Sequence, residues 1–117
     1  MTEPTRIFHN PRCSKSRQTL ELLREHNIEP EIIRYLETPP TEAELKQIIS
    51  MLGCHPRDAM RTSEKDYKEQ DLGNPALSED ELIRAMVKTP KLIERPIVIR
   101  GDRAVLGRPP ENVLKLI

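Results

Sequence analysis

The residue best placed to do chemistry is Cys13, in the segment Asn10-Pro11-Arg12-Cys13-Ser14-Lys15. A predicted strand ends just before it and a helix begins near it, so the sulfur would lie beside unpaired N–H groups and the positive end of the helix dipole. The basic side chains of Arg12, Lys15 and Arg17 act in the same direction, and thiols in such surroundings ionise more easily. We therefore expect Cys13 to be largely a thiolate at neutral pH. The alternative is a buried cysteine that packs as a small apolar residue, which the polar neighbours disfavour.

The same turn could also bind an anion, because a helix start presents N–H donors to phosphate-like oxygens. Cys13 and Ser16 form a Cys-x-x-Ser pattern, the one-thiol version of a redox motif. The hydroxyl of Ser16, in the first turn of this helix, bonds either the thiolate or a backbone group. The second cysteine, Cys54, is either a resolving thiol for Cys13, which would couple the protein to thioredoxin, or a packing residue without a redox role.

The composition limits the classes of protein that the chain can belong to. With 117 residues it fits one domain over residues 1–117. It has 19 basic and 19 acidic residues, no Trp, one Phe and two Tyr, so neither a basic surface nor aromatic stacking predicts nucleic-acid binding. His9, His26 and His55 are far apart and lack metal-ligand spacing. We therefore expect no bound metal.

The hydropathy of the chain favours a cytoplasmic protein that does not bind or cross a membrane. No apolar run approaches the roughly 20 residues that a bilayer requires, and residues 1–11 lack the apolar stretch of a signal peptide. Two cysteines are too few for a disulfide scaffold, and a cytoplasmic setting would keep them reduced.

The charges are segregated along the chain although they cancel overall. Residues 4–20 carry four basic side chains and no acidic ones, and residues 91–108 carry five basic and two acidic side chains. Residues 21–52 and 62–90 are acidic in balance. Such clustering is often only solvated surface. The two basic stretches, however, flank the first strand-to-helix turn and the ends of later strands, where open α/β sheets bind ligands.

The first third of the chain predicts a strand, a helix and a second strand. Residues 6–9 read as a strand stopped by Asn10-Pro11, residues 13 to about 25–27 as a helix with Thr19, Leu20, Leu22 and Leu23 on its apolar stripe, and residues 31–36 as the next strand. This order indicates a parallel βαβ unit.

The rest of the chain predicts a helical block followed by a hairpin and a last helix. Capping boxes at Thr41–Glu44 and Ser78–Glu81 predict two helix starts, with a short helix near 56–60 and loops over the remainder of 53–76. Residues 96–99 and 104–106 flank Gly101-Asp102 and predict a hairpin with a tight primed turn. The final helix should begin at Pro109 or Pro110. Its inward residues are expected to be Val113, Leu116 and Ile117.

Four blocks of sequence, at residues 9–17, 35–39, 94–98 and 107–111, resemble the ArsC-type, glutaredoxin-coupled arsenate reductases. They run in the same order over essentially the whole chain. The resemblance implies an α/β, thioredoxin-like fold with a helical insertion and a four-stranded mixed sheet. Because the chain ends at Ile117 and the neighbours of Cys13 differ from those of the long plasmid-type enzymes, it looks like the short chromosomal branch.

The resemblance also implies roles for individual residues. Cys13 looks like the catalytic cysteine, and Arg61, Arg95 and Arg108 look like the arginines that bind the oxyanion. Planar guanidinium groups suit this task because they bind tetrahedral oxyanions through two parallel hydrogen bonds. His9 either polarises the thiolate or packs at the strand end. Ser16 and Arg17 are expected to support the site.

The implied reaction is the reduction of arsenate to arsenite. Cys13 would attack As(V) to form a covalent thiol–arsenate adduct, glutathione would supply the second thiol as a co-substrate, and glutaredoxin would recycle the mixed disulfide. The resemblance implies no bound organic cofactor for this reaction. In the family's fold the proline that opens the strand facing the cysteine is cis, so we predict a cis Arg95–Pro96 bond.

Three other classes of protein remain open. The first is a glutathione-dependent thiol–disulfide reductase that uses Cys13 without arsenate. The second is an Spx-like regulator that binds RNA polymerase, although such proteins typically carry Cys-x-x-Cys and this chain has Ser16 instead. The third is a phosphatase-like oxyanion binder, which lacks support because the arginine of a Cys-x5-Arg loop is replaced by Thr19.

Overall fold

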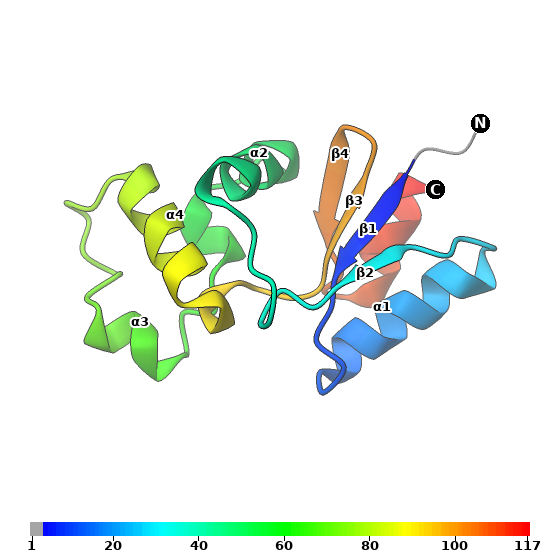
Figure 1. Ribbon diagram of the computed structural model, residues 1–117, viewed down its shortest axis with the longest axis horizontal. Coiled ribbons are helices and arrows are strands. Elements are labelled where there is room, and N and C mark those ends of the chain that lie inside the picture. Colours follow the sequence, from blue (N-terminus) through cyan, green and yellow to red (C-terminus); the bar gives the residue numbers. More distant parts are fainter. Residues whose placement is uncertain (1–3) are drawn as a thin grey trace. The chain divides into compact units, whose positions relative to one another are not determined.

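Residues 4–117 are described by the computed structural model and divide into two units (Figure 1). The sheet unit runs up to Thr38 and resumes from Arg95 to Ile117, and the helical unit is Pro39–Glu94. The helical unit coincides with the insertion that the sequence resemblance implied. The expectation of a single domain over residues 1–117 stays a prediction.

The sheet unit contains four strands in the order β2-β1-β3-β4. β1 (Thr5–Phe8) pairs in parallel with β2 (Glu31–Ile33) and antiparallel with β3 (Ile97–Arg100), and β3 pairs antiparallel with β4 (Arg103–Leu106). Helix α1 (Ser14–Glu25) connects β1 to β2. The predicted βαβ unit, the hairpin and the four-stranded mixed sheet are therefore confirmed.

Strand β2 is shorter than the strand predicted over residues 31–36. It ends at Ile33 because the chain turns there: the Tyr35 N–H donates to the Ile33 carbonyl at 3.0 Å, and residues 35–37 form a turn. The Tyr35 ring is buried and stacks on Phe8, with ring centroids 6.1 Å apart. Tyr35 thus serves packing, not strand pairing.

The hairpin between β3 and β4 turns through two residues, Gly101 and Asp102. Arg100 and Arg103 form the last pair of the ladder. Gly101 has a φ of 61°, whereas the φ of Asp102 is not positive. A positive φ at the first central position only is the type II′ pattern, which glycine adopts without strain. The predicted primed turn is confirmed.

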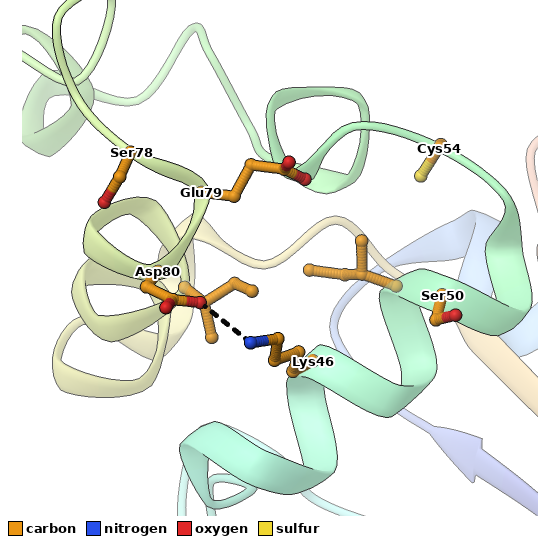
Figure 2. A pocket seen from close by; sticks show the side chains of 8 residues that line it. Lys46, Ser50, Cys54, Ser78, Glu79 and Asp80 are labelled. Atoms are coloured by element: carbon orange, nitrogen blue, oxygen red, sulfur yellow. Dashed lines mark ion pairs between the residues drawn. The ribbon is translucent and has the colours of Figure 1, made fainter.

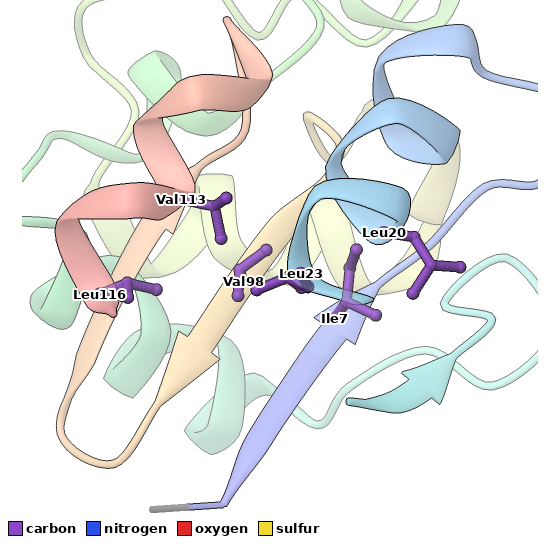
Figure 3. Packing of buried hydrophobic residues seen from close by; sticks show 6 residues of the cluster. All are labelled: Ile7, Leu20, Leu23, Val98, Val113 and Leu116. Atoms are coloured by element: carbon purple, nitrogen blue, oxygen red, sulfur yellow. The ribbon is translucent and has the colours of Figure 1, made fainter. Parts of the chain in front are cut away.

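One face of the sheet is covered by α1 and by the last helix, η3 (Pro110–Leu116). Figure 3 shows the cluster that they bury, in which Ile7 and Val98 are paired neighbours on β1 and β3. Each side chain of the cluster is at most 8% exposed. The six residues are Ile7, Leu20, Leu23, Val98, Val113 and Leu116.

Helix η3 is a 3-10 helix, and this changes which residues face inward. A 3-10 helix has three residues per turn, and its buried residues, Pro110, Val113 and Leu116, are spaced by three. Ile117 follows directly after Leu116 and therefore points away, with 51% of its surface exposed. The expectation that Ile117 faces the core was wrong, whereas Val113 and Leu116 were correctly assigned.

The helical unit contains three α-helices and two short 3-10 helices among the described residues. The predicted helices are present as α2 (Glu42–Leu52), η1 (Pro56–Ala59) and α4 (Glu79–Lys88). Two further elements, α3 (Lys65–Glu69) and η2 (Pro90–Leu92), were not predicted. Helix α3 is only five residues long and buries none of them, so it leaves no apolar periodicity in the sequence.

Both predicted capping boxes are formed. The Glu44 N–H donates to Thr41 Oγ1 at 3.1 Å, and the Thr41 N–H donates to a Glu44 carboxylate oxygen at 3.3 Å. Ser78 and Glu81 make the equivalent bonds at 3.2 and 3.3 Å. Each box satisfies two otherwise unpaired N–H groups and so fixes where its helix begins.

Helices α2 and α4 pack against each other and form the core of the helical unit. Their buried side chains repeat at helical spacing and form one apolar stripe on each helix. Leu52 and Val87, at the ends of the two stripes, are only half-buried. Within residues 4–117 no helix combines the length and the apolar character needed to cross a membrane. The buried residues of the two stripes are Leu45, Ile48, Ile49, Leu82, Ile83 and Met86.

Candidate active site

Cys13 is the N-cap residue of α1, at the turn where the sequence placed it. Its backbone is extended, with φ −92° and ψ 122°. Its N–H donates to the Asn10 carbonyl at 3.0 Å, and its carbonyl accepts the Arg17 N–H, also at 3.0 Å, as the first bond of the helix. The side chain is half-buried. The sulfur therefore lies where the first N–H groups of α1 have no partner within the helix.

The surroundings of the sulfur favour its ionised form. Burial raises the pKa of the Cys13 thiol, but the Ser16 backbone N–H, the positive charge of Arg95, the Lys15 backbone N–H and a hydrogen bond from the Arg95 side chain together lower it below its ordinary value. The sulfur accepts no capping hydrogen bond. The amides of Lys15 and Ser16 therefore act on it as dipoles. The positive charge comes from Arg95, not from the adjacent basic side chains that the sequence suggested.

His9 and Ser16 form a buried hydrogen-bonded pair beside this turn. His9 Nδ1 lies 2.6 Å from Ser16 Oγ, and the Asn10 N–H donates to the same oxygen at 3.1 Å. Burial, followed by the charges of nearby arginines, lowers the pKa of His9. A neutral imidazole can accept the Ser16 hydroxyl proton at Nδ1, a tautomer assigned from the hydrogen-bond network. Of the two roles considered for the Ser16 hydroxyl, the structure has the one in which it bonds a backbone group.

The loop of residues 9–12 is held by further side-chain bonds. Asn10 Oδ1 accepts the Arg12 N–H at 3.0 Å. Arg17 Nη1 donates to the Pro11 carbonyl at 2.9 Å. Arg17 thus fixes the loop that leads into Cys13, and the supporting role expected of it in the site stays a prediction.

Arg95 and Arg108 are brought together by the two segments that flank the hairpin. The Arg95–Pro96 peptide bond is cis, as predicted, and the Arg108–Pro109 bond is also cis, which the sequence reasoning missed. Arg108 Nη1 donates to the Arg95 carbonyl at 3.1 Å. The Arg95 side chain also interacts with the Cys13 sulfur, so the sheet unit has one guanidinium group at the thiol and a second one bonded to the backbone of Arg95.

Thr19 and Gly107 form a close contact that the sequence reasoning missed. Thr19 Oγ1 donates to the Lys15 carbonyl at 2.8 Å and lies 3.4 Å from the Gly107 carbonyl. The Gly107 N–H donates to the Pro96 carbonyl at 2.9 Å. A Cβ atom on Gly107 would lie 2.6 Å from Thr19 Oγ1 and 2.7 Å from Pro96 Cγ. A glycine before Arg108 is thus required for β4, α1 and the cis-proline segment to approach this closely.

Arg61 belongs to the helical unit. Its Nη1 forms an ion pair with Glu64 at 2.7 Å, and its N–H donates to the Leu92 carbonyl at 2.8 Å. An isolated bridge between Met60 and Ile93 holds the same segment. The oxyanion-binding role expected of Arg61 stays a prediction.

Cys54 also lies in the helical unit, and its surroundings raise its pKa, whereas those of Cys13 lower it. Burial and then the negative charge of Asp58 raise the pKa of the Cys54 thiol, so it is protonated at neutral pH. Figure 2 shows it at the edge of a cavity of about 420 Å³ between α2 and α4, where Lys46 and Asp80 form an ion pair at 3.2 Å. Its assignment as a resolving thiol or a packing residue stays a prediction.

No group of three His, Cys, Asp or Glu side chains within residues 4–117 is arranged to hold a metal ion. The chemical resources of the site are thus a thiol with a lowered pKa, two arginines and the amides of a helix start. This arrangement can bind an anion and attack it with sulfur.

The fold and the site define a class of proteins: thioredoxin-like α/β proteins with one cysteine of lowered pKa at a helix start and a cis-proline segment that carries Arg95. The ArsC family model matches residues 8–116, and the chain belongs to the ArsC family. The structure of an arsenate reductase from Vibrio cholerae is 49% identical, has a TM-score of 0.97 and covers both chains completely.

Relatives in sequence are similar over nearly the whole chain. The uncharacterised protein YfgD of Escherichia coli (strain K12) is 52% identical over 118 residues, which cover 100% of this chain and 99% of YfgD. An arsenate reductase of Neisseria meningitidis serogroup A is 50% identical over 109 residues, with 92% of this chain and 93% of that protein covered. The family resemblance found from four sequence blocks is confirmed.

Proposed function

We propose that the protein is an arsenate reductase whose nucleophile is the Cys13 thiolate. The observation that carries this proposal is the lowered pKa of Cys13 next to the Arg95 guanidinium. Relatives of the same family that are about 50% identical are named arsenate reductase, which supports the choice of oxyanion.

In the first step, arsenate binds with its oxygens to Arg95 and Arg108, and by resemblance also to Arg61. Their positive charge offsets that of the oxyanion, which otherwise repels a thiolate. The Cys13 sulfur forms a bond to As(V), one As–O bond breaks, and the released oxygen takes up protons and leaves as water. The product is a covalent thiol–arsenate adduct.

In the second step, glutathione supplies another thiol. The sulfurs of Cys13 and glutathione lose two electrons and form one mixed disulfide, while As(V) gains two electrons and is released as arsenite. Glutaredoxin and a second glutathione then reduce this disulfide and restore the thiol. This donor suits the cytoplasmic setting that we infer for the protein.

The proposal is tested by following NADPH oxidation with purified protein, arsenate, glutathione, glutaredoxin and glutathione reductase. We expect turnover that depends on arsenate, disappears in Cys13→Ser and persists in the matched variant Cys54→Ser. Two results together would contradict glutathione as the source of the second thiol and indicate Cys54 instead. Turnover would be lost in Cys54→Ser, and thioredoxin would support turnover of the wild-type protein.

A thiol–disulfide reductase is the second candidate, because a cysteine with a lowered pKa can equally attack a disulfide. A mixed disulfide of glutathione and a small thiol distinguishes the two functions. Fast reduction of this disulfide without any arsenate-dependent NADPH oxidation would contradict the first proposal and favour the second.

A further inference from the structure

A cavity of about 320 Å³ lies beside the loop that leads into Cys13. Residues 9–12 line one side of it, and Arg34, Leu36 and Glu37 line the other. The Asn10 carbonyl in this loop accepts the Cys13 N–H at 3.0 Å, so the cavity wall is bonded directly to the backbone of the nucleophile. Pockets that hold small ligands have volumes of about 300 to 1,000 Å³. The cavity therefore has room for one small molecule beside the loop that precedes Cys13.

Two arginines and one carboxylate give this cavity its charge. Arg12 is exposed and forms no ion pair with any residue between positions 4 and 117. Arg34 and Glu37 are 4.0 Å apart, with side chains that are 61% and 71% exposed. A pair so long and so exposed contributes little, so all three groups can engage a ligand. His9, which also lines the cavity, adds no charge at neutral pH because burial lowers its pKa.

We propose that this cavity binds glutathione and presents its thiol to the arsenic held on Cys13. The assignment rests on the proposed function. At neutral pH glutathione carries two carboxylates and one ammonium group, and the cavity offers the complementary set: the guanidinium groups of Arg12 and Arg34 and the carboxylate of Glu37. Arginine binds carboxylates through two parallel hydrogen bonds. Leu36, which is 46% exposed, provides apolar surface for the methylene groups of the tripeptide.

This charge pattern separates the cavity from an oxyanion site. Glu37 offers a contact to the ammonium group of a zwitterionic peptide, which an inorganic anion cannot use. The oxyanion is instead bound by the arginines of the hairpin segments, so the two substrates reach Cys13 through different sets of residues.

Binding is tested without arsenate, by NMR titration of the protein with S-methylglutathione, which cannot react. We expect amide shifts concentrated at residues 9–12 and 34–37. The double variant Arg12→Gln/Arg34→Gln should raise the Kd at least about tenfold, whereas the exposed control Arg84→Gln, in the helical unit, leaves it unchanged. An unchanged Kd in the double variant, shifts confined to other residues, or no binding at millimolar ligand would each overturn the proposal.

Turnover separates this proposal from the proposed function. In the arsenate assay the double variant should raise the KM for glutathione about tenfold but leave the KM for 2-mercaptoethanol, a thiol without charged groups, unchanged. An equal effect on both thiols, or none on either, would contradict the glutathione site. Absence of arsenate turnover in the wild-type protein would instead contradict the proposed function, and the titration would still decide whether the cavity binds the tripeptide.

Discussion

Replacing Gly107 by alanine is the most direct test of how the site is held together. The added Cβ would lie 2.6 Å from Thr19 Oγ1, 2.7 Å from Pro96 Cγ and 3.1 Å from Thr19 Cγ2. Neither neighbour is the end of a flexible side chain, since Thr19 is fully buried and Pro96 is a ring. Gly107 has no left-handed φ, so the cost of alanine is steric and not conformational.

The magnitude follows from overpacking. Extra atoms in a well-packed region usually cost about 1–3 kcal/mol, which for a chain of this length corresponds to a Tm lower by roughly 4 °C per kcal/mol. Because Thr19 supplies two of the three close atoms, Thr19→Ala should relieve part of the clash. The cost of Gly107→Ala should then be about 1 kcal/mol smaller in the Thr19→Ala background.

Urea unfolding of the wild type, the two single variants and the double variant measures these terms as a double-mutant cycle. The matched control is Gly73→Ala, whose Cβ would meet Tyr67 Oη at an ordinary 3.4 Å. We expect the control to stay within about 0.5 kcal/mol of the wild type or to be slightly more stable.

Two results would refute this reasoning. One is a Gly107→Ala protein as stable as the wild type, which would mean that β4 and α1 separate at no cost. The other is an identical cost of Gly107→Ala with and without Thr19, which would mean that the contact with Thr19 is not the source of strain.

Three further predictions concern charge, protonation and helix capping. Arg95→Gln removes a positive charge and a hydrogen bond from the Cys13 sulfur, so the thiol pKa should rise and the pH profile of alkylation by iodoacetamide should move to higher pH. His9 has a lowered pKa in the folded protein, so the unfolded chain binds more protons than the folded one below about pH 6.5. The free energy of unfolding should therefore fall as the pH is lowered through this range. Urea titrations should show a less steep fall in His9→Gln. Ser78→Ala removes a capping box and should cost about 1 kcal/mol in the same assay.

Each of these predictions has a matched control. Arg12→Gln removes a charge next to Cys13 in the sequence, but Arg12 is not among the groups that shift the Cys13 pKa. The pH profile of alkylation should therefore stay in place in this variant. A larger effect than that of Arg95→Gln would contradict the electrostatics of the site. A pH dependence as steep in His9→Gln as in the wild type would assign the titration to another group. Ser78→Asp keeps a capping oxygen and should retain most of the stability.

Features that depend on a few neighbouring residues were predictable from the sequence. The capping boxes of α2 and α4, the Gly101 turn and the N-cap position of Cys13 each require only contacts within about four positions of the chain. Their outcome is fixed by local hydrogen bonds and backbone preferences, and the structure has them where they were expected.

Features that depend on the choice between similar local structures were not predictable. The residues of η3 fit both a 3.6-residue and a three-residue period, and only packing under the sheet selects the latter. Apolar residues after Ile33 fit a strand equally well, but Tyr35 is instead stacked on Phe8. Ile117 and the end of β2 were therefore misassigned.

The sequence indicated the residues of the candidate site but not their physical connections. The resemblance pointed to Cys13, Arg95 and Arg108, whose roles stay predictions; all three lie in the sheet unit, where the Arg95 side chain interacts with the Cys13 sulfur and the Arg95 carbonyl accepts a hydrogen bond from Arg108. Arg95 places its positive charge beside the Cys13 sulfur, and Gly107 must be small because Thr19 lies against it. Both contacts join residues that are far apart in the chain. A single sequence carries no signal for such pairs.

The pairing of β1 with β3 affects how the protein can fold during its synthesis on the ribosome. β1 is made first, yet its partner β3 begins only at Ile97, so the centre of the sheet cannot close until nearly the whole chain has been translated. The helical unit, by contrast, is one uninterrupted stretch, Pro39–Glu94, whose contacts are complete earlier. Nascent chains therefore expose the apolar faces of β1 and α1 for several seconds at ordinary rates of synthesis, and it is during this interval that a chaperone would have something to hold.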